Sequence, residues 1–310
     1  MVPDTRGYFS TLVGDGRPLI SLTAICLALA GGFAIFQSAS GEFLPHDTAY
    51  LGMSTRELCG IDQCRIVHFM FHDRVSFGGS LIAIAAMYLW MAEFPLRAGE
   101  AWAWWTLAAS GALGFGSFLT YLGYGYLDTW HGVATLFLLP CFVGGLAMTW
   151  KLVRGQAGYK LPWPAWRSTA GRGRALMLTA GALMIVAGVT IQIIGMTTVF
   201  VPTDLAFMGL TREQIAAINP RLIPLIAHDR AGFGGGVATA GLLVLGSVWW
   251  GRPSKSLWQA LLVGGIAGWG CAIGIHPIIG YTSAIHVGPA IGVAALYFMG
   301  LGMMGRGAGV

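Results

Sequence analysis

The chain has 310 residues, of which 55% are hydrophobic and only 10% are charged, whereas soluble domains have about 25% charged residues. A water-soluble fold of this size cannot bury so much apolar surface, so soluble enzymes and disordered chains are excluded. The net charge of +5 comes from basic residues in short loops between apolar runs, a distribution that excludes a nucleic-acid-binding surface.

Eight apolar runs are each long enough to cross the roughly 30 Å of hydrocarbon in a bilayer. In chain order they cover residues 18–40, 66–91, 102–122, 130–150, 175–199, 223–250, 257–276 and 283–303. They predict an all-α, multi-pass membrane protein with eight transmembrane helices, in contact with the lipid bilayer of the cell (inner) membrane.

The loops between these runs predict the orientation of the chain. Lys and Arg concentrate in one set of loops, above all in 151–174, which holds six of them. Cytoplasmic loops carry such an excess of positive charge. We therefore expect both termini to be cytoplasmic and the long loops 41–65 and 200–222 to face outward.

The sequence repeats itself once, at a spacing of about 156 residues. The motif His-Asp-Arg-x-x-Phe-Gly-Gly begins at His72 and again at His228, and Thr-Arg-Glu begins at Thr55 and again at Thr211. The repeat predicts two four-helix bundles, formed by residues 1–150 and 175–310 and joined by the basic linker 151–174.

Arginines recur on the outer side at the repeat spacing, although topology normally keeps that side free of positive charge. Arg74 and Arg230 lie inside the His-Asp-Arg motif, and we expect them to hold an anion in each half. The alternative is that they pair with neighbouring aspartates. Arg56 and Arg212 stand in Thr-Arg-Glu, a pattern typical of the first turn of a helix with a Thr cap.

Four histidines occupy equivalent places, near the outer starts of the second, fourth, sixth and eighth runs: His72, His131, His228 and His286. Two imidazoles that face each other across a bundle core are the axial ligands of six-coordinate haem iron. Glycines beside them, such as Gly78-Gly79 and Gly234-Gly235-Gly236, leave room for a flat macrocycle. We therefore predict metal or haem ligation by these histidines, with the propionates held by Arg74 and Arg230.

Two other histidines break the repeat. His68 precedes His72 by one helical turn, and His276 ends the seventh run. Both are candidate cofactor-binding residues, and they indicate that the two sites have diverged. A metal-free proton relay is the alternative, and zinc is disfavoured because no compact Cys or carboxylate set completes a tetrahedron. His46 is expected to be a solvated loop residue.

Cys59 and Cys64 lie close together in the first outer loop. The outer face is oxidising, so a disulfide between them is expected. It would serve either as a structural staple or as a redox pair that acts on the adjacent site.

The whole pattern resembles the haem A synthase family, which has eight spans, two similar halves and a histidine near the outer end of each even-numbered helix. The resemblance implies one haem site framed by His72 and His131 and another framed by His228 and His286. It also implies that one half binds haem b and that the other oxidises a ring methyl of haem O. The cysteine pair is a feature of many bacterial members.

One motif of that family is not matched. The family pattern is Glu-x-x-Glu-His-x-x-Arg, whereas residues 65–74 contain neither glutamate. Asp73 is the acidic residue that would replace them, so the catalytic candidates are His72, Asp73 and His131.

Three functions follow from these features. The first is a haem A synthase-like oxidoreductase that acts on haem O. The alternative is a membrane b-type cytochrome that exchanges electrons with quinone or with respiratory electron-transfer proteins, alone or in a larger complex. The third is a transporter or structural membrane subunit without haem.

Overall fold

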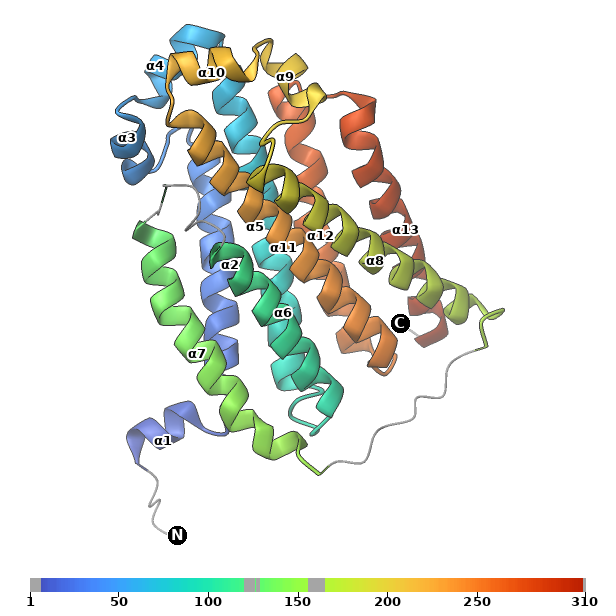
Figure 1. Ribbon diagram of the computed structural model, residues 1–310. Coiled ribbons are helices and arrows are strands. Elements are labelled where there is room, and N and C mark those ends of the chain that lie inside the picture. Colours follow the sequence, from blue (N-terminus) through green and yellow to red (C-terminus); the bar gives the residue numbers. More distant parts are fainter. Residues whose placement is uncertain (1–6, 120–125, 127–128, 156–164, 309–310) are drawn as a thin grey trace.

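The computed structural model describes residues 7–119, 126, 129–155 and 165–308, with the side chains of 129–131 and 307–308 left aside. The described residues form thirteen helices and no sheet. The eight long helices run side by side in one bundle (Figure 1). They are α2 (Arg17–Ala39), α5 (Arg65–Glu93), α6 (Ala101–Leu119), α7 (Thr129–Val153), α8 (Thr169–Met196), α11 (Leu222–Trp250), α12 (Lys255–Ile279) and α13 (Ala284–Ala308).

Seven of these helices are long and apolar enough to cross a membrane: α2, α5, α7, α8, α11, α12 and α13. The chain is thus a multi-pass membrane protein by helix length and hydropathy. The eighth, α6, has 19 residues and three tryptophans near its start, and it is not among these seven. It nevertheless lies within the bundle and packs against α11 and α7.

Four short helices cover one end of the bundle, here called the capped end (Figure 1). They are α3 (Pro45–Leu51), α4 (Thr55–Asp62), α9 (Pro202–Met208) and α10 (Arg212–Ile218). A further short helix, α1 (Tyr8–Val13), lies at the opposite end. The order of α3 and α4 before α5 recurs as α9 and α10 before α11, so the repeat of the sequence is also a repeat of elements.

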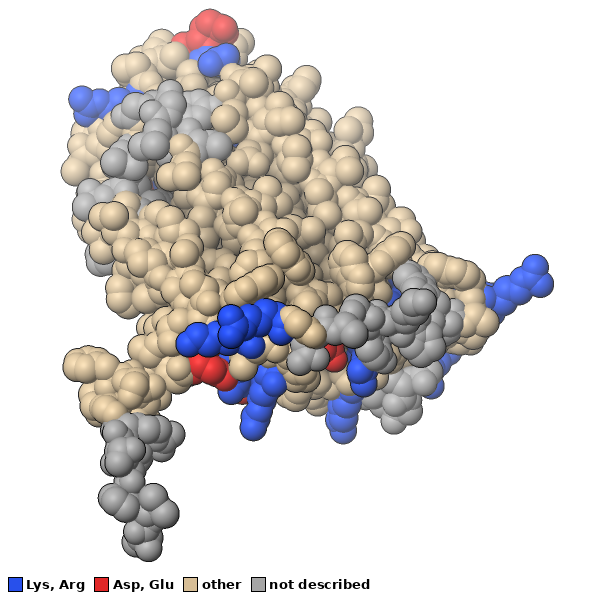
Figure 2. Space-filling model, turned by 60° about the horizontal axis from the view of Figure 1, so that its bottom comes forward, with Lys and Arg blue, Asp and Glu red and all other residues tan. Residues whose placement is uncertain are grey.

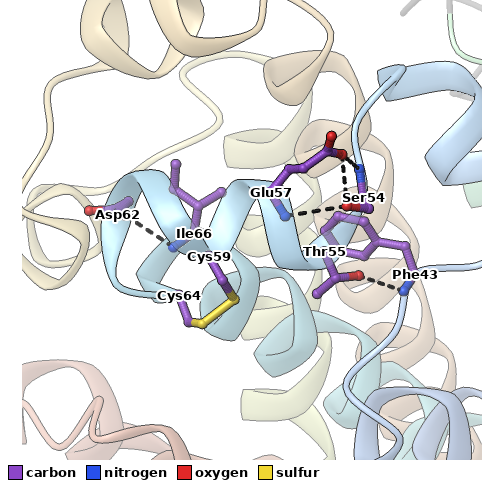
Figure 3. The surroundings of a disulfide bond; sticks show 8 residues. All are labelled: Phe43, Ser54, Thr55, Glu57, Cys59, Asp62, Cys64 and Ile66. Atoms are coloured by element: carbon purple, nitrogen blue, oxygen red, sulfur yellow. Dashed lines mark hydrogen bonds between the residues drawn. A yellow bond between two sulfur atoms is a disulfide. The ribbon is translucent and has the colours of Figure 1, made fainter.

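The two Thr-Arg-Glu motifs begin helices, but they are capped differently. Thr211 caps α10 as expected, because its side chain accepts a hydrogen bond from the backbone N–H of Gln214. In α4 the cap is Ser54, which forms a capping box with Glu57 (Figure 3). Thr55 instead accepts a hydrogen bond from the backbone N–H of Phe43, at 2.9 Å.

The disulfide between Cys59 and Cys64 is formed (Figure 3). It links α4 to the residue that precedes α5. Gln63 and Cys64 both have left-handed backbone conformations, with φ of 49° and 65°, which cost free energy in residues other than glycine. The disulfide therefore closes a tight turn between the two helices.

The two halves interlock. Helices α5 and α11 are the most buried of the membrane-crossing helices, and they contact each other at the centre. Each packs against the first helix of its own half, α5 on α2 and α11 on α8. However, α12 of the second half packs against α5, and α6 of the first half packs against α11. Helices of each half therefore pack against the other half, and the chain does not form two separate four-helix bundles.

The glycines of the repeated motif allow helices to cross closely; they do not line a site for a macrocycle. A Cβ on Gly78 would lie 2.7 Å from the carbonyl oxygen of Gly31 on α2, and a Cβ on Gly234 would lie 2.4 Å from the backbone nitrogen of Gln192 on α8. Such contacts are typical of small residues at helix interfaces in membranes. Their role differs from the expected one because these faces of α5 and α11 are turned toward neighbouring helices.

Charged residues are distributed unevenly along the bundle. Lys and Arg side chains gather at the end opposite the capped end (Figure 2). Helix ends there carry Arg17, Lys151, Arg154, Arg172, Lys255 and Arg306. This end is the one that the positive-inside rule would place in the cytoplasm.

Candidate functional site

Three histidines from three helices meet near the capped end. They are His72 on α5, His276 on α12 and His286 at the start of α13. One nitrogen of each ring lies within 4.8 Å of the others, and the Nε2 atoms of His72 and His276 are 3.1 Å apart. The ring centroids of His72 and His286 are 5.4 Å apart. This group, here called the histidine triad, is the only cluster of potential metal ligands of its kind among the described residues.

Asp73 determines which ring nitrogen of His72 carries the hydrogen. Asp73 lies 3.0 Å from Nδ1 of His72, and a carboxylate can only accept, so Nδ1 carries the hydrogen and Nε2 presents a lone pair. Histidines that bind metals almost always donate their second N–H to such a partner. The Nε2 atom of His72 is therefore oriented as a metal-binding nitrogen, and without a metal it accepts a hydrogen bond from His276.

Asp73 is held in turn by an arginine from the other half. Its second oxygen accepts a hydrogen bond from Nε of Arg230, at 3.3 Å. Arg230 also pairs with Asp204, at 2.5 Å, and donates to the carbonyl oxygen of Val199. Tyr281 donates to the remaining oxygen of Asp204, at 2.8 Å. All four polar side chains are buried or nearly so.

A second network repeats the first. His228 donates to Asp229 at 3.1 Å, and Asp229 accepts from Nε of Arg74 at 2.8 Å. Arg74 also pairs with Asp47 at 2.8 Å, and Tyr126 donates to the other oxygen of Asp47. Each network thus joins an Asp next to the histidine of one half to the arginine of the other half.

These contacts decide between the two interpretations of Arg74 and Arg230. Each guanidinium lies between two aspartates, so both arginines form the aspartate pairs that were the alternative to anion binding. Two arginines and four aspartates leave two negative charges, one for each network. A negative environment favours a cation nearby and disfavours haem propionates at this position.

Tyr281, which joins α12 to α13, is part of this environment. Its side chain is buried and stacks on Phe207 and His286, with ring centroids 4.5 Å and 4.1 Å away. Burial, together with the nearby charge of Asp204, raises the pKa of Tyr281 far above its usual value. The phenol therefore stays protonated and remains a hydrogen-bond donor.

A cavity of about 370 Å³ adjoins the histidine triad. This α8–α13 cavity lies between α8 and α13, and α5, α11 and α12 also contribute to its wall. His72, His276 and His286 stand at its polar end, and the rest is mostly apolar, with Ile191, Phe233 and Trp269 among the lining residues. Its size and composition are those of a ligand-binding site.

A second cavity, of about 460 Å³, occupies the repeat-related position. This α2–α7 cavity is lined by His228, Asp229 and Arg74 at one end and by apolar residues of α2 at the other. His46 also lines it, with a side chain only 17% exposed and Nε2 3.4 Å from Asp47. The expectation that His46 is solvated was therefore wrong, because α3 folds back over the bundle.

The histidines are brought together across the halves. His72 of the first half lies against His276 and His286 of the second, whereas the pairs expected from the sequence were His72 with His131 and His228 with His286. The side chain of His131 lies outside the described residues. His68 is half-buried and lines neither cavity. His276 joins the triad because α12 crosses to α5, a contact that no local pattern in the sequence indicates.

The comparisons with known proteins add no further assignment. The chain matches no family model, no curated protein and no solved structure.

Proposed function

We propose that the chain is an integral membrane redox protein that binds a metal at the histidine triad, and that this metal is the iron of haem b. In this proposal eight helices cross the membrane, both termini are cytoplasmic and the capped end faces outward. The observation that carries it is the convergence of three imidazoles, two of them buried and that of His286 partly buried, at the end of a mostly apolar cavity. Haem iron would supply one-electron oxidation and reduction.

The surroundings of the triad fit this group in three respects. Asp73 fixes the ring of His72 so that Nε2 is available to iron. The α8–α13 cavity offers mostly apolar walls beside that nitrogen. The charge of the adjacent network is negative, and a ferric porphyrin core carries one positive charge. His72 and His286 would hold the iron.

The position of Asp73 favours electron transfer over oxidation of a haem-like substrate. A catalytic acid must reach the reacting atoms, but both oxygens of Asp73 are already engaged, by His72 and by Arg230. Asp73 is therefore a positioning residue. A b-type cytochrome is accordingly the function that this geometry supports best, and a haem A synthase-like activity on haem O is the second candidate.

One observation favours a metal ion without a porphyrin at the histidine triad. The Nε2 atoms of His72 and His276 are 3.1 Å apart, which is the separation of two nitrogens bound to one ion at about 2.1 Å. In this case a non-haem transition-metal ion would bind all three histidines, and no porphyrin would lie between His72 and His286.

The test is an absorption spectrum and a metal analysis of the purified protein, with His72→Ala, His276→Ala and His286→Ala beside the wild type. If the protein binds haem b, the wild type gives a reduced-minus-oxidised spectrum. We expect His72→Ala and His286→Ala to lose this spectrum and His276→Ala to keep it. A non-haem ion gives no such spectrum, and its content falls in all three variants. His68→Ala, one turn before His72, is the matched control and should bind like the wild type. A wild-type protein without metal or haem would refute the proposal, and conversion of haem O to haem A would favour the enzyme.

A further inference from the structure

The α2–α7 cavity is divided into a polar and an apolar end. His46, Asp47, Arg74, His228 and Asp229 line the polar end, near the capped end of the bundle. Leu29, Ala30, Phe33, Ala34, Leu44, Phe77, Leu81 and Ala134 line the apolar part, and Gln37 and Ser38, near the end of α2, also line the cavity. The cavity shares no lining residue with the α8–α13 cavity. It is therefore a separate site for a molecule with a small polar head and an apolar remainder.

The mouth of this cavity opens sideways. Leu29 and Phe33 line the cavity, and 68% and 53% of their surfaces are exposed. Helix α2 is one of the helices that are apolar enough to cross a membrane, so its outer surface faces lipid. A ligand would thus enter from the bilayer, and it must itself be soluble in lipid.

The polar end selects the head group by charge. Arg74 is shared by Asp47 and Asp229, so this end carries one net negative charge. A carboxylate or phosphate head would be repelled, which excludes fatty acids and phospholipids. A neutral head with hydrogen-bonding oxygens is compatible with the site.

The hydrogen-bonding groups at this end suit a head with hydroxyl or carbonyl oxygens. Asp229 holds the hydrogen of His228 on Nδ1, which makes Nε2 the accepting nitrogen of this ring. Arg74 uses Nε and Nη1 for its two aspartates, and a guanidinium has five N–H donors, which leaves donors for a carbonyl. Phe77 provides an aromatic ring in the wall.

From these features we propose that the α2–α7 cavity binds the ring of a membrane quinone or quinol, with its isoprenoid tail leaving between Leu29 and Phe33. The proposal deepens the proposed function by naming the electron donor or acceptor, but the binding itself rests on the cavity. The two cavities would then have different occupants, a metal in one and a quinone in the other.

Binding is measured by calorimetric titration of the purified protein in detergent with decylubiquinone, and with oleic acid as a probe that has an apolar tail and a carboxylate head. We expect the quinone to bind and oleic acid to bind at least tenfold more weakly. Ala30→Trp fills the α2–α7 cavity and should weaken quinone binding at least tenfold. Ala187→Trp, which fills the α8–α13 cavity at the position related by the repeat, is the matched control and should leave quinone binding unchanged.

Phe33→Trp keeps an aromatic side chain at the mouth and provides a second readout. The fluorescence that it adds to the wild-type spectrum should be quenched by decylubiquinone. The proposal is overturned if Ala30→Trp binds quinone like the wild type, if Ala187→Trp abolishes binding, if oleic acid binds equally well or if the added fluorescence is not quenched.

The quinone proposal and the metal proposal fail in different ways. The variant His276→Ala/His286→Ala removes two triad ligands but leaves the α2–α7 cavity intact, so it should bind quinone with unchanged affinity. Quinone binding by a protein that contains no metal would refute only the proposed function. Loss of quinone binding in this variant would refute the placement of the quinone in the α2–α7 cavity.

Discussion

At the scale of single residues, the buried charged side chains determine the arrangement of the site more than the histidines do. Arg74 and Arg230 lie inside membrane-crossing helices, where charge is costly unless it is paired. Each is satisfied by two aspartates, and two of these aspartates also orient a histidine. The networks therefore stabilise the fold and also orient the histidines. Separate variants test these two roles.

The stability role is tested with Arg74→Gln. The variant removes the guanidinium but leaves Asp47 and Asp229 buried beside each other, and breaking a buried ion pair in this way costs about 3–5 kcal/mol. We expect a loss of that size in the free energy of unfolding, measured by denaturant titration in detergent. Arg56→Gln changes an exposed arginine on α4 and should stay within about 0.5 kcal/mol of the wild type. Equal effects of the two variants would contradict the network.

The orienting role is tested with Asp73→Asn and Asp229→Asn. Loss of the partner that fixes a metal-binding histidine lowers metal affinity about 10–100-fold, so Asp73→Asn should weaken binding at the triad by this factor. Asp229→Asn makes the same change beside His228, which is not part of the triad, and should leave the affinity near that of the wild type. Titration of the metal-free protein with metal or haem measures both. Similar losses in the two variants would show that Asp73 acts through folding alone.

At the scale of helices, close packing depends on glycines at particular positions. On α2, a Cβ at Gly31 would lie 2.5 Å from the carbonyl oxygen of Gly78 on α5, whereas a Cβ at the next residue, Gly32, would meet nothing within 4 Å. The two glycines have the same helix propensity, so they differ only in what they face. Substitutions at these two glycines therefore distinguish an effect on helix packing from an effect on helix formation.

Gly31→Val should therefore destabilise the protein, because α2 and α5 must move apart. Overpacking of this kind costs about 1–3 kcal/mol. Gly32→Val should be near neutral or slightly stabilising, because valine replaces glycine on the lipid-facing side of the same helix. Thermal unfolding in detergent measures the difference, and equal melting temperatures of the two variants would contradict the close crossing of α2 and α5.

At the scale of the whole molecule, the sequence predicts the helices well and their partners poorly. Each of the eight apolar runs is a long helix, because length and hydropathy are local properties of the chain. The triad was not foreseen as a group, because His276 reaches His72 only through the packing of α12 on α5. The repeat relates His72 to His228 and His131 to His286, but it does not indicate whether the histidine-bearing helices pair within a half or across halves.

The packing of the two halves against each other leads to a further prediction. His72 belongs to the first half, and His276 and His286 belong to the second, so neither half alone contains the triad. When the chain is cut in the linker between α7 and α8, each fragment expressed by itself should bind no metal or haem at the triad. Co-expression should restore binding, because the membrane inserts the helices of each fragment independently and the interlocked contacts then reassemble them.

Co-expression with His72→Ala in the first fragment is the control, and it should remove binding without preventing the fragments from copurifying. Metal binding by the second fragment alone, with the spectrum of the intact protein, would mean that His276 and His286 suffice and that the halves are independent. Copurification of fragments that together carry all three histidines but bind nothing would place the metal elsewhere. The distribution of the triad over three helices from both halves therefore makes cofactor binding a direct measure of correct assembly.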